Sequence, residues 1–374
     1  MVGGGQLARM SAAPAAALGI DFRVLATSPG ESAAQVVSDV FVGRHDDERA
    51  VLAFAEGVDV VTFDHEHVPP AILEKLQDRG VAVRPGPHAL INAQDKAVMR
   101  RTLAGAGAPV PRWRVVDTPA QADEFAQEVG YPLILKTSRG GYDGKGVWRI
   151  GDRREVISVM AGALPPGAEW LAEEAVLFVQ ELSAQVARSP SGQTVAYPVV
   201  RTVQTAGICS EVVAPAPDLS DERAVLAQRI ALDVAGALDV TGMLAVEMFD
   251  TGDELLVNEL AMRPHNSGHW TIEGAVTSQF ENHLRAVLDL PLGAPNLRAR
   301  SAVMVNILGG DVGDLYSAYR HVFARDPGVK VHLYGKEVRP GRKVGHVTLV
   351  GDDADSMLAR ARHAADYFAG VIDE

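Results

Sequence analysis

The first 87 residues alternate between helix-like and strand-like patterns, and this alternation constrains the fold more than any other feature. Apolar residues recur at helical spacing, or run as short stretches bounded by turn residues. From this spacing we expect helices over 6–18, 46–56 and 70–79, and strands over 22–27, 58–63 and 81–84. Repeated βα units predict a mainly parallel sheet covered on both faces. The run Arg84-Pro-Gly-Pro87 breaks the pattern and predicts a domain boundary.

The rest of the chain is richer in strands. We expect one helical stretch over 88–106 and, after it, a compact β-rich segment. Further helices are expected over 119–129, 221–238 and 355–368. Strands are expected over 113–116, 133–137 and 147–150, in 171–213, as a hairpin over 243–260, and in a last β-rich portion over 301–350.

Composition excludes several classes of partner. The chain has 374 residues, a formal charge of −13 and a pI of about 5.3. Because nucleic acids and anionic membranes bind basic surfaces, we expect neither as a partner, although a small phosphorylated ligand needs only a few local cations. No run of 18 apolar residues predicts a membrane span. The single cysteine, Cys209, rules out an internal disulfide framework, fits a packed strand residue, and indicates a reducing, cytoplasmic location.

Glycines at Gly3, Gly4 and Gly5 precede the first expected helix. Backbone N–H groups at such a helix start can bind the phosphate of a small molecule. A tight turn for helix–sheet packing explains them equally well. A nicotinamide-dinucleotide fingerprint is disfavoured, since no acidic residue ends the next strand. Only Met1 and Val2 stand where a strand should precede the glycines, so we expect the recorded start to lie a few residues inside the natural gene product, and the opening does not resemble an exported leader.

The segment RGGYDGKG, residues 139–146, holds four glycines between two expected strands. Such a loop can wrap its N–H groups around the oxygens of a triphosphate. Lys136 at the end of the preceding strand and Lys96 on a preceding helix add positive charge, as do Arg139 and Lys145. The pattern does not fit a P-loop. A glycine-rich hairpin without a ligand is the alternative, and the local cations in an acidic chain favour phosphate.

Two apolar strands over 243–260 each carry a carboxylate, Glu247 on one and Glu259 on the other. If the turn between them has an odd number of residues, the two carboxylates face each other about 5 Å apart. They would then repel unless a cation lies between them, and hard oxygen ligands suit Mg²⁺. A four-residue turn would place them on opposite faces, which favours one solvated glutamate instead.

Two polar clusters follow. The loop after the second carboxylate strand carries Arg263, His265, Asn266, Ser267 and His269, which we interpret as a substrate-binding loop rather than a self-satisfied surface loop. Zinc is disfavoured because Pro264 and Gly268 argue against the helix that two histidines at this spacing need. A second cluster has four cations around a Pro-Gly turn, and it fits a solvated hairpin tip or the phosphate of a nucleotide substrate equally well. These cations are Lys336, Arg339, Arg342 and Lys343.

Taken together, five motifs resemble the ATP-grasp ligases, and among them the N5-carboxyaminoimidazole ribonucleotide synthase family of purine biosynthesis. The motifs are GGGQLARM, DHEHV, GGYDGKG, NELAMRPHNSGHWT and KEVRPGRKVGH, and they run nearly end to end. The resemblance implies an α/β and α+β fold: an N-terminal doubly wound parallel-sheet domain (1–87), a linker helix with a small central lid (88–176), and a C-terminal mixed or antiparallel sheet domain (177–374) with a terminal β-rich portion over about 296–374.

The resemblance also implies a set of residues for ATP and its metal ion. The 139–146 loop would close over the phosphates, the 173–176 segment would frame the adenine, and Glu181 would take the ribose hydroxyls. The implied ATP-binding residues are Lys96, Lys136, Gly141, Tyr142, Asp143, Gly144, Lys145, Gly146, Val147, Glu173, Glu174, Ala175, Val176, Glu181, Gln204, Asn258 and Glu259. Glu247, Glu259 and Asn258 would hold Mg²⁺, with Mn²⁺ as a substitute.

The implied reaction is the ATP- and bicarbonate-dependent carboxylation of 5-aminoimidazole ribonucleotide, through carboxyphosphate, by a homodimer. Asp143 would orient the amine and Arg263 would steady the carboxylate. The implied substrate-binding residues are Gln6, Leu7, Glu66, Tyr142, Asp143, Arg263, His265, Asn266, Lys336, Arg342 and Lys343. The alternatives are another ATP-grasp ligase, such as a formate-using transformylase or a biotin carboxylase, a Rossmann-type reductase, and an inactive nucleotide-binding module.

Overall fold

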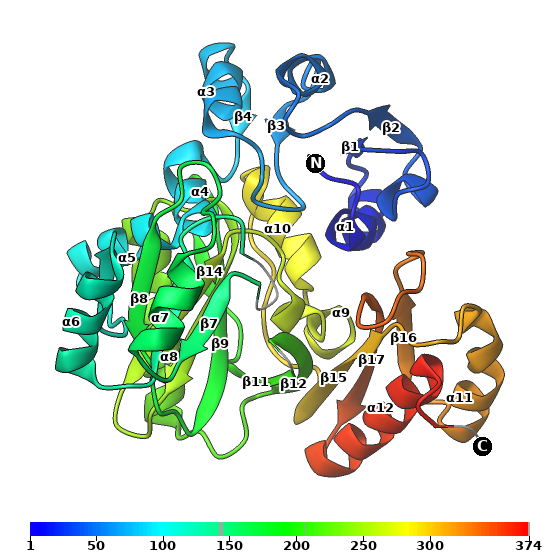
Figure 1. Ribbon diagram of the computed structural model, residues 1–374. Helices are drawn as coiled ribbons and strands as arrows, with labels where there is room; N and C mark the ends of the chain where they lie inside the picture. The colour runs from blue at the N-terminus through cyan, green and yellow to red at the C-terminus, as the bar shows by residue number, and fades with distance from the viewer. Residues whose placement is uncertain (142–144, 206, 373–374) are drawn as a thin grey trace.

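The computed structural model describes residues 1–141, 145–205 and 207–372 (Figure 1). Its N-terminal part contains α1 (Gln6–Ala17), β1 (Arg23–Ala26), β2 (Asp39–Val42), α2 (Glu48–Phe54), β3 (Val60–Val61), α3 (Pro70–Asp78) and β4 (Ala82–Val83). The pairs β1–β2 and β3–β4 are parallel, as the βα alternation predicts. Val2 bridges in parallel to both Leu25 and Phe63, so a single residue joins the two ladders. Strand β2 was not predicted.

Two helices, α4 (Pro87–Gln94) and α5 (Lys96–Gly105), stand where we expected one continuous helix over 88–106. That expectation was wrong, and the break lies at Asp95, whose backbone is extended. The Asp95 side chain accepts hydrogen bonds from the N–H groups of Ala97 and Val98, which caps α5. Lys96 therefore stands in the first turn of a helix whose start is fixed.

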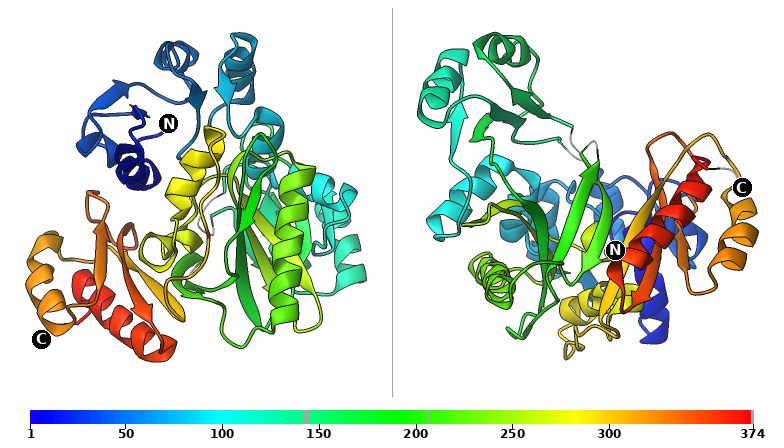
Figure 2. Two further views of the ribbon diagram at one scale, coloured as in Figure 1. Left: turned by 180° about the vertical axis from the view of Figure 1, so that it is seen from behind. Right: turned by 90° about the horizontal axis from the view of Figure 1, so that it is seen from below.

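A four-stranded antiparallel sheet forms the central lid, in the order β5-β8-β6-β7. It projects to one side in the view from below (Figure 2). Its strands are β5 (Trp113–Val116), β6 (Leu133–Thr137), β7 (Val147–Ile150) and β8 (Trp170–Glu174), and its helices are α6 (Pro119–Val129) and α7 (Arg153–Met160). Phe125, Leu135 and Trp170 are buried in the core between sheet and helices. Helix α7 was not predicted.

The largest sheet that the structure describes has nine antiparallel strands, in the order β14-β13-β9-β11-β12-β15-β17-β16, with β10 also paired to β9. Its strands are β9 (Gln180–Arg188), β10 (Thr194–Ala196), β11 (Val200–Thr205), β12 (Ile208–Ala214), β13 (Gly242–Asp250), β14 (Leu255–Ala261), β15 (Ser301–Leu308), β16 (Lys330–Leu333) and β17 (Lys343–Gly351). One continuous sheet therefore includes the β13–β14 hairpin, which carries Glu247 and Glu259, and the strands β15, β16 and β17 of the last β-rich portion.

Helices cover this sheet and connect it to the N-terminal part (Figure 1). These helices are α8 (Asp221–Ala237), α9 (Thr271–Gly274), α10 (Gln279–Val287), α11 (Tyr319–Arg325) and α12 (Ala354–Ala369), with short 3₁₀ turns η1 (Ala33–Gln35), η2 (Asn266–Gly268) and η3 (Leu315–Ala318). Helix α8 packs on β9 and β13, and α12 packs on β15 and β17. Helix α10 contacts α1 as well as β13, and its His283 Nε2 lies 2.8 Å from the Thr62 Oγ1 of the N-terminal part. No helix in the described ranges is long and apolar enough to cross a membrane.

Candidate active site

Glu247 of β13 and Glu259 of β14 are direct cross-strand partners. The connection between the strands has four residues, 251–254, and with regular pairing this even number would place the two side chains on opposite faces. The ladder instead shifts register by one residue, because Met248 pairs with Val257 and Asn258 is left as a bulge. The odd-numbered turn that we considered is absent, and the bulge brings the carboxylates onto the same face.

The face that carries these glutamates is acidic. Burial raises the pKa of Glu247 to about 8, and Glu259 and Glu181 add to the rise. Burial also raises the pKa of Glu181, on the neighbouring strand β9, to about 7. A buried carboxylate whose pKa is raised by burial and by neighbouring negative charge favours a bound cation, and oxygen donors suit Mg²⁺. Within the residues that the structure covers, no group of three or more His, Cys, Asp or Glu side chains could hold a metal by itself.

Two lysines reach this hairpin from other elements. Lys96 Nζ of α5 lies 3.3 Å from Glu259 Oε1. Lys136 Nζ of the lid strand β6 lies 3.4 Å from Asn258 Oδ1 and 2.6 Å from Glu173 Oε2. The structure therefore brings together five residues that the family resemblance assigned to one ATP and metal site. The lid sheet and the nine-stranded sheet meet at this point.

The glycine-rich segment begins at the same place. Arg139 Nε pairs with Asp95 Oδ2 at 2.7 Å, which ties the base of the segment to the start of α5. Gly146 has a φ of +71°, and a Cβ there would come within 2.6 Å of Thr137 Oγ1, so glycine is required. The other side of the loop is equally tight, since a Cβ on Gly141 would meet the carbonyl oxygen of Lys145. Val147 begins β7, whereas the predicted residues Tyr142, Asp143 and Gly144 lie outside the described ranges.

The segment assigned to the adenine has two engaged carboxylates. Glu173 is buried and bonds Arg100 as well as Lys136, so its side chain is occupied. Glu174 accepts hydrogen bonds from the backbone N and the Nε of Arg112, each at 2.8 Å. Main-chain groups, together with the half-buried Ala175 and Val176, are therefore what this segment offers to a ligand. Gln204 is half-buried on β11.

Residues assigned to the second substrate converge from opposite ends of the chain. Arg263 Nε pairs with Glu66 Oε1 of the N-terminal part at 2.7 Å. Lys336 Nζ donates a hydrogen bond to Gln6 Oε1, across 330 positions of sequence. Leu7, by contrast, is buried in α1 and has only its main chain to offer.

In the polar loop after β14, His265 and Asn266 are half-buried, whereas the residues from Ser267 to Trp270 are buried. His265 Nδ1 lies 2.9 Å from Ser267 Oγ, and burial with Arg263 and Lys343 lowers its pKa well below the usual value, so the ring is neutral. Asn266 Nδ2 is buried beside the Cys209 thiol, and a hydrogen bond from Asn266 opposes the rise that burial causes in the pKa of Cys209. Because an amide nitrogen has two N–H groups, Asn266 keeps donor capacity for a ligand. His269 is fully buried and bonds Gln279, so it belongs to the core.

The two remaining predicted cations lie at the tip and the start of β17. Arg342 is exposed and its Nη1 donates to the carbonyl oxygen of Glu337 at 3.1 Å. Lys343 is half-buried, and its charge acts on Glu247 and His265, which places it near the hairpin carboxylates.

Comparisons with known protein families match almost the whole chain. A Ribonucleotide synthetase preATP-grasp domain model matches residues 1–94, an ATP-grasp domain model matches 101–280, and a Phosphoribosylaminoimidazole carboxylase C-terminal domain model matches 302–360. The N5-carboxyaminoimidazole ribonucleotide synthase of Mycobacterium tuberculosis H37Rv is 53% identical over 373 residues, which cover 99% of this chain and 87% of that protein. This chain belongs to the N5-carboxyaminoimidazole ribonucleotide synthase family. The resemblance stated from the motifs is thereby confirmed.

Solved structures of this synthase family agree. The N5-carboxyaminoimidazole ribonucleotide synthetase of Thermus thermophilus has a TM-score of 0.87 at 40% identity and covers 100% of this chain and 99% of its own. The N5-carboxyaminoimidazole synthase of Aspergillus clavatus, in complex with ADP and 5-aminoimidazole ribonucleotide, has a TM-score of 0.87 at 32% identity over 98% of both chains. The expected ATP-grasp fold class is confirmed.

Sequence reasoning about this chain missed two buried charged residues. Asp64, in the DHEHV motif, accepts a hydrogen bond from the Gly5 backbone N, and burial raises its pKa. One N–H group of the glycine turn is therefore already bound to a carboxylate of the chain. Arg100 is completely buried and bonds Glu173. Asp64 could have been suspected from its place two residues before Glu66, whereas Arg100 in an ordinary helical pattern gives no such signal.

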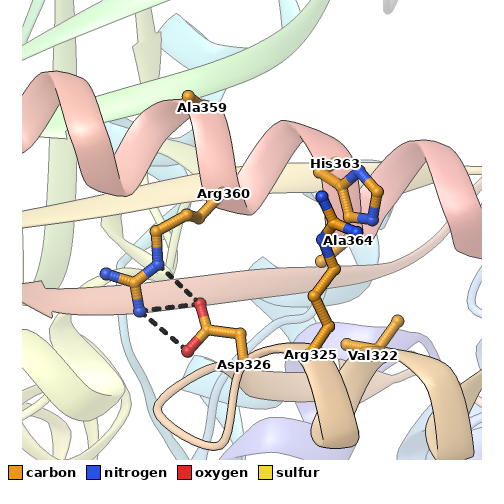
Figure 3. A pocket seen from close by; sticks show the side chains of 7 residues that line it. All are labelled: Val322, Arg325, Asp326, Ala359, Arg360, His363 and Ala364. Atoms are coloured by element: carbon orange, nitrogen blue, oxygen red, sulfur yellow. Dashed lines mark hydrogen bonds and ion pairs between the residues drawn. The ribbon is translucent and has the colours of Figure 1, made fainter.

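A separate pocket of about 420 Å³ lies between α11 and α12, away from this site (Figure 3). Two of its residues are already paired, because the guanidinium of Arg360 holds Asp326 through Nε at 2.8 Å and Nη2 at 2.7 Å. None of the residues predicted for ATP or substrate lines it.

Proposed function

We propose that this chain is an ATP-dependent carbon–nitrogen ligase that carboxylates 5-aminoimidazole ribonucleotide to N5-carboxyaminoimidazole ribonucleotide in purine biosynthesis. Membership of the synthase family supports the reaction. The Aspergillus clavatus complex with ADP and 5-aminoimidazole ribonucleotide supports an adenine nucleotide and this ribonucleotide as ligands. The observation that carries the proposal is the contact of two lysines, Lys96 and Lys136, with Glu259 and Asn258 of one bulged hairpin. Cations beside opposed carboxylates form a site for a metal-bound triphosphate.

The residues present fit Mg²⁺. Glu247, Glu259 and the bulged Asn258 offer hard oxygen donors. Burial raises the pKa of Glu247, and the negative charges of Glu259 and Glu181 raise it further. A bound Mg²⁺ would neutralise phosphate charge and hold the triphosphate in line for transfer. Lys96 and Lys136 would add point charges to the nucleotide from two further elements.

Bicarbonate is the third substrate of the proposed reaction, beside ATP and the ribonucleotide. An oxygen of bicarbonate attacks the γ-phosphorus, the bond to the β-phosphate oxygen breaks, and ADP and carboxyphosphate result. The exocyclic amine then forms a bond to the carbon of carboxyphosphate, phosphate leaves, and the amine loses a proton. Carboxyphosphate hydrolyses in water, so the glycine-rich segment has to exclude solvent during turnover.

The second substrate site would lie between the N-terminal part and the loop after β14. Arg263, held by Glu66, is placed to steady the forming carboxylate, and Asp143 is assigned to orient the amine. Gln6 and Lys336 meet at the same boundary and suit the phosphate and ribose of a ribonucleotide. His265 is neutral and Asn266 has a donor to spare, so both suit hydrogen bonding rather than charge pairing.

The proposal is tested by ADP production with and without 5-aminoimidazole ribonucleotide, in bicarbonate-supplied and bicarbonate-depleted buffer. We expect ADP to form at a substantial rate only when both substrates are present. ADP formation that depends on formate, or that ignores the ribonucleotide, would instead support another ATP-grasp ligase. From the family resemblance we also propose a homodimer, which light scattering coupled to size-exclusion chromatography measures directly.

A further inference from the structure

Lys136, which is assigned to the nucleotide, is the last of three buried charged residues that contact one another in a chain. Arg100 of α5 donates from Nε to Glu173 Oε1 at 2.6 Å, and Glu173 Oε2 pairs with Lys136 Nζ at 2.6 Å. The side chains of Arg100, Glu173 and Lys136 are 0%, 3% and 10% exposed. Both carboxylate oxygens are therefore used, one by each cation, and the group carries a net charge of +1.

Strand register explains why Glu173 meets Lys136. Glu173 of β8 pairs directly with Ile134 of β6, two residues before Lys136, so the two charged side chains are diagonal neighbours on one face. Burial would raise the pKa of Glu173, but Lys136 and Arg100 outweigh it and hold this pKa at about 2. The carboxylate of Glu173 is thus ionised near neutral pH.

Arg100 also reaches the metal-binding hairpin. Its Nη1 donates to the Val257 carbonyl oxygen of β14 at 3.0 Å, immediately before the bulged Asn258. One side chain on α5 therefore bonds both the lid sheet, through Glu173, and the nine-stranded sheet, through Val257. The two sheets are those that supply Lys136 and Glu259 to the proposed nucleotide site.

We propose that Arg100 is a positioning residue for the nucleotide: it holds Glu173, and through it Lys136, in fixed relation to the strand of Asn258 and Glu259. Without Arg100, Glu173 and Lys136 would form a neutral pair, and both oxygens of the carboxylate could bind the Lys136 ammonium. Because Arg100 occupies one oxygen of the Glu173 carboxylate, Lys136 has only the other oxygen, and one carboxylate does not neutralise two cations. The identity of that ligand as an adenine nucleotide rests on the proposed function.

The first test is calorimetric titration with Mg-ADP of the full chain and of Arg100→Met, which removes the charge and both hydrogen bonds. We expect Kd to rise about tenfold, the effect of one lost buried charged contact. Arg101→Met is the matched control, because Arg101 is the next residue of α5, is 49% exposed, and pairs with Glu169 at the surface. Its Kd should match the unaltered chain.

The second test separates positioning from a general loss of structure. In steady-state turnover we expect Arg100→Met to raise KM for ATP about tenfold and to change KM for 5-aminoimidazole ribonucleotide by less than about twofold. Equal rises in both KM values, or an unchanged Kd for Mg-ADP in the folded variant, would overturn the proposal.

Removing one partner of a buried charge cluster can prevent folding, so Arg100→Lys is the second variant. Lysine keeps the charge and can reach Glu173, but it lacks the fork needed to reach Val257 at the same time. We expect its Kd for Mg-ADP to lie between those of the unaltered chain and Arg100→Met, or about threefold raised if Arg100→Met does not fold. An unchanged Kd in Arg100→Lys, when Arg100→Met does not fold, rejects the bridging role. Failure of the unaltered chain to turn over 5-aminoimidazole ribonucleotide would contradict the proposed function and leave the Mg-ADP result as an independent test of Arg100.

Discussion

Arg263 and Glu66 form an ion pair, with 2.7 Å between Nε and Oε1, across the boundary between the loop after β14 and the N-terminal part. Their side chains are 22% and 13% exposed, so water screens the pair only partly. A substrate carboxylate near Arg263 would therefore meet a guanidinium that is already oriented.

The first prediction concerns Glu66→Gln, which keeps the shape and removes the charge that orients Arg263. We expect KM for 5-aminoimidazole ribonucleotide to rise about tenfold, the effect of one charged hydrogen bond, with KM for ATP unchanged. Steady-state kinetics with each substrate varied in turn measures this. Glu48→Gln is the control, since Glu48 forms an exposed pair with Lys75 at 2.6 Å on the same domain. An unchanged KM for the ribonucleotide would argue against the assigned site.

The second prediction concerns Glu259→Gln, which removes one of the two opposed carboxylates. Mg-ATP turnover should fall at least about a hundredfold, because a direct ligand of the proposed metal is lost. The ligand-free variant should remain folded, since the change also relieves repulsion with Glu247. Glu254→Gln in the exposed connection between the two strands is the control. Turnover close to that of the unaltered chain would remove Glu259 from the metal site.

Helices and strands were predicted well from the sequence where a single pattern of apolar residues extends over the whole element. Strands β5, β6 and β7 lie where the pattern placed them, within one residue. The single helix expected over 88–106 failed because Asp95 fits a helical pattern by polarity, while its side chain caps the following helix instead. A cap between two amphipathic helices looks like one polar position of a longer helix.

The candidate site shows a different limit. The facing of Glu247 and Glu259 depends on a bulge at Asn258, and no local pattern signals that one strand will carry an extra residue. Counting turn residues assumed a regular ladder, and for the four-residue turn that is present it predicted opposite faces, an outcome that the bulge reverses. Arg100 went unnoticed for a related reason: its partners, Glu173 and Val257, lie 73 and 157 positions away.

The third prediction concerns pH and Glu181, whose pKa burial raises from 4.5 to about 7. Between these values the folded protein holds a proton that the unfolded chain has released, so the free energy of unfolding falls as pH rises from about 5 to about 7. Chemical denaturation of the ligand-free protein at several pH values measures the slope. In Glu181→Gln the slope should be shallower, with Glu247 supplying the remainder, because burial raises its pKa to about 8. A slope identical to that of the unaltered chain would contradict the raised pKa of Glu181.

The last prediction concerns Gly146 at the end of the glycine-rich segment. Gly146→Ala places a Cβ at a φ of +71° and within 2.6 Å of Thr137 Oγ1. The Thr137 side chain then has to rotate, or the strand-end contact from Thr137 N to the Gly146 carbonyl oxygen at 2.9 Å has to shift. The strain alone costs about 1–2 kcal/mol. We expect the affinity for Mg-ADP to fall at least about tenfold, since a shift here moves the start of β7 and the segment assigned to the phosphates.

A matched variant separates backbone strain from the steric contact. Gly192 has a φ of +86°, and a Cβ there would meet nothing within 4 Å, so Gly192→Ala carries the strain without the clash and lies in a different turn. Both variants should lower the midpoint of thermal unfolding, whereas only Gly146→Ala should weaken Mg-ADP binding in calorimetry. Equal Mg-ADP affinity of the two variants would mean that the segment ending at Gly146 does not hold the nucleotide. Both glycines have a positive φ, and Gly146 differs from Gly192 by its place beside Thr137 and Lys136.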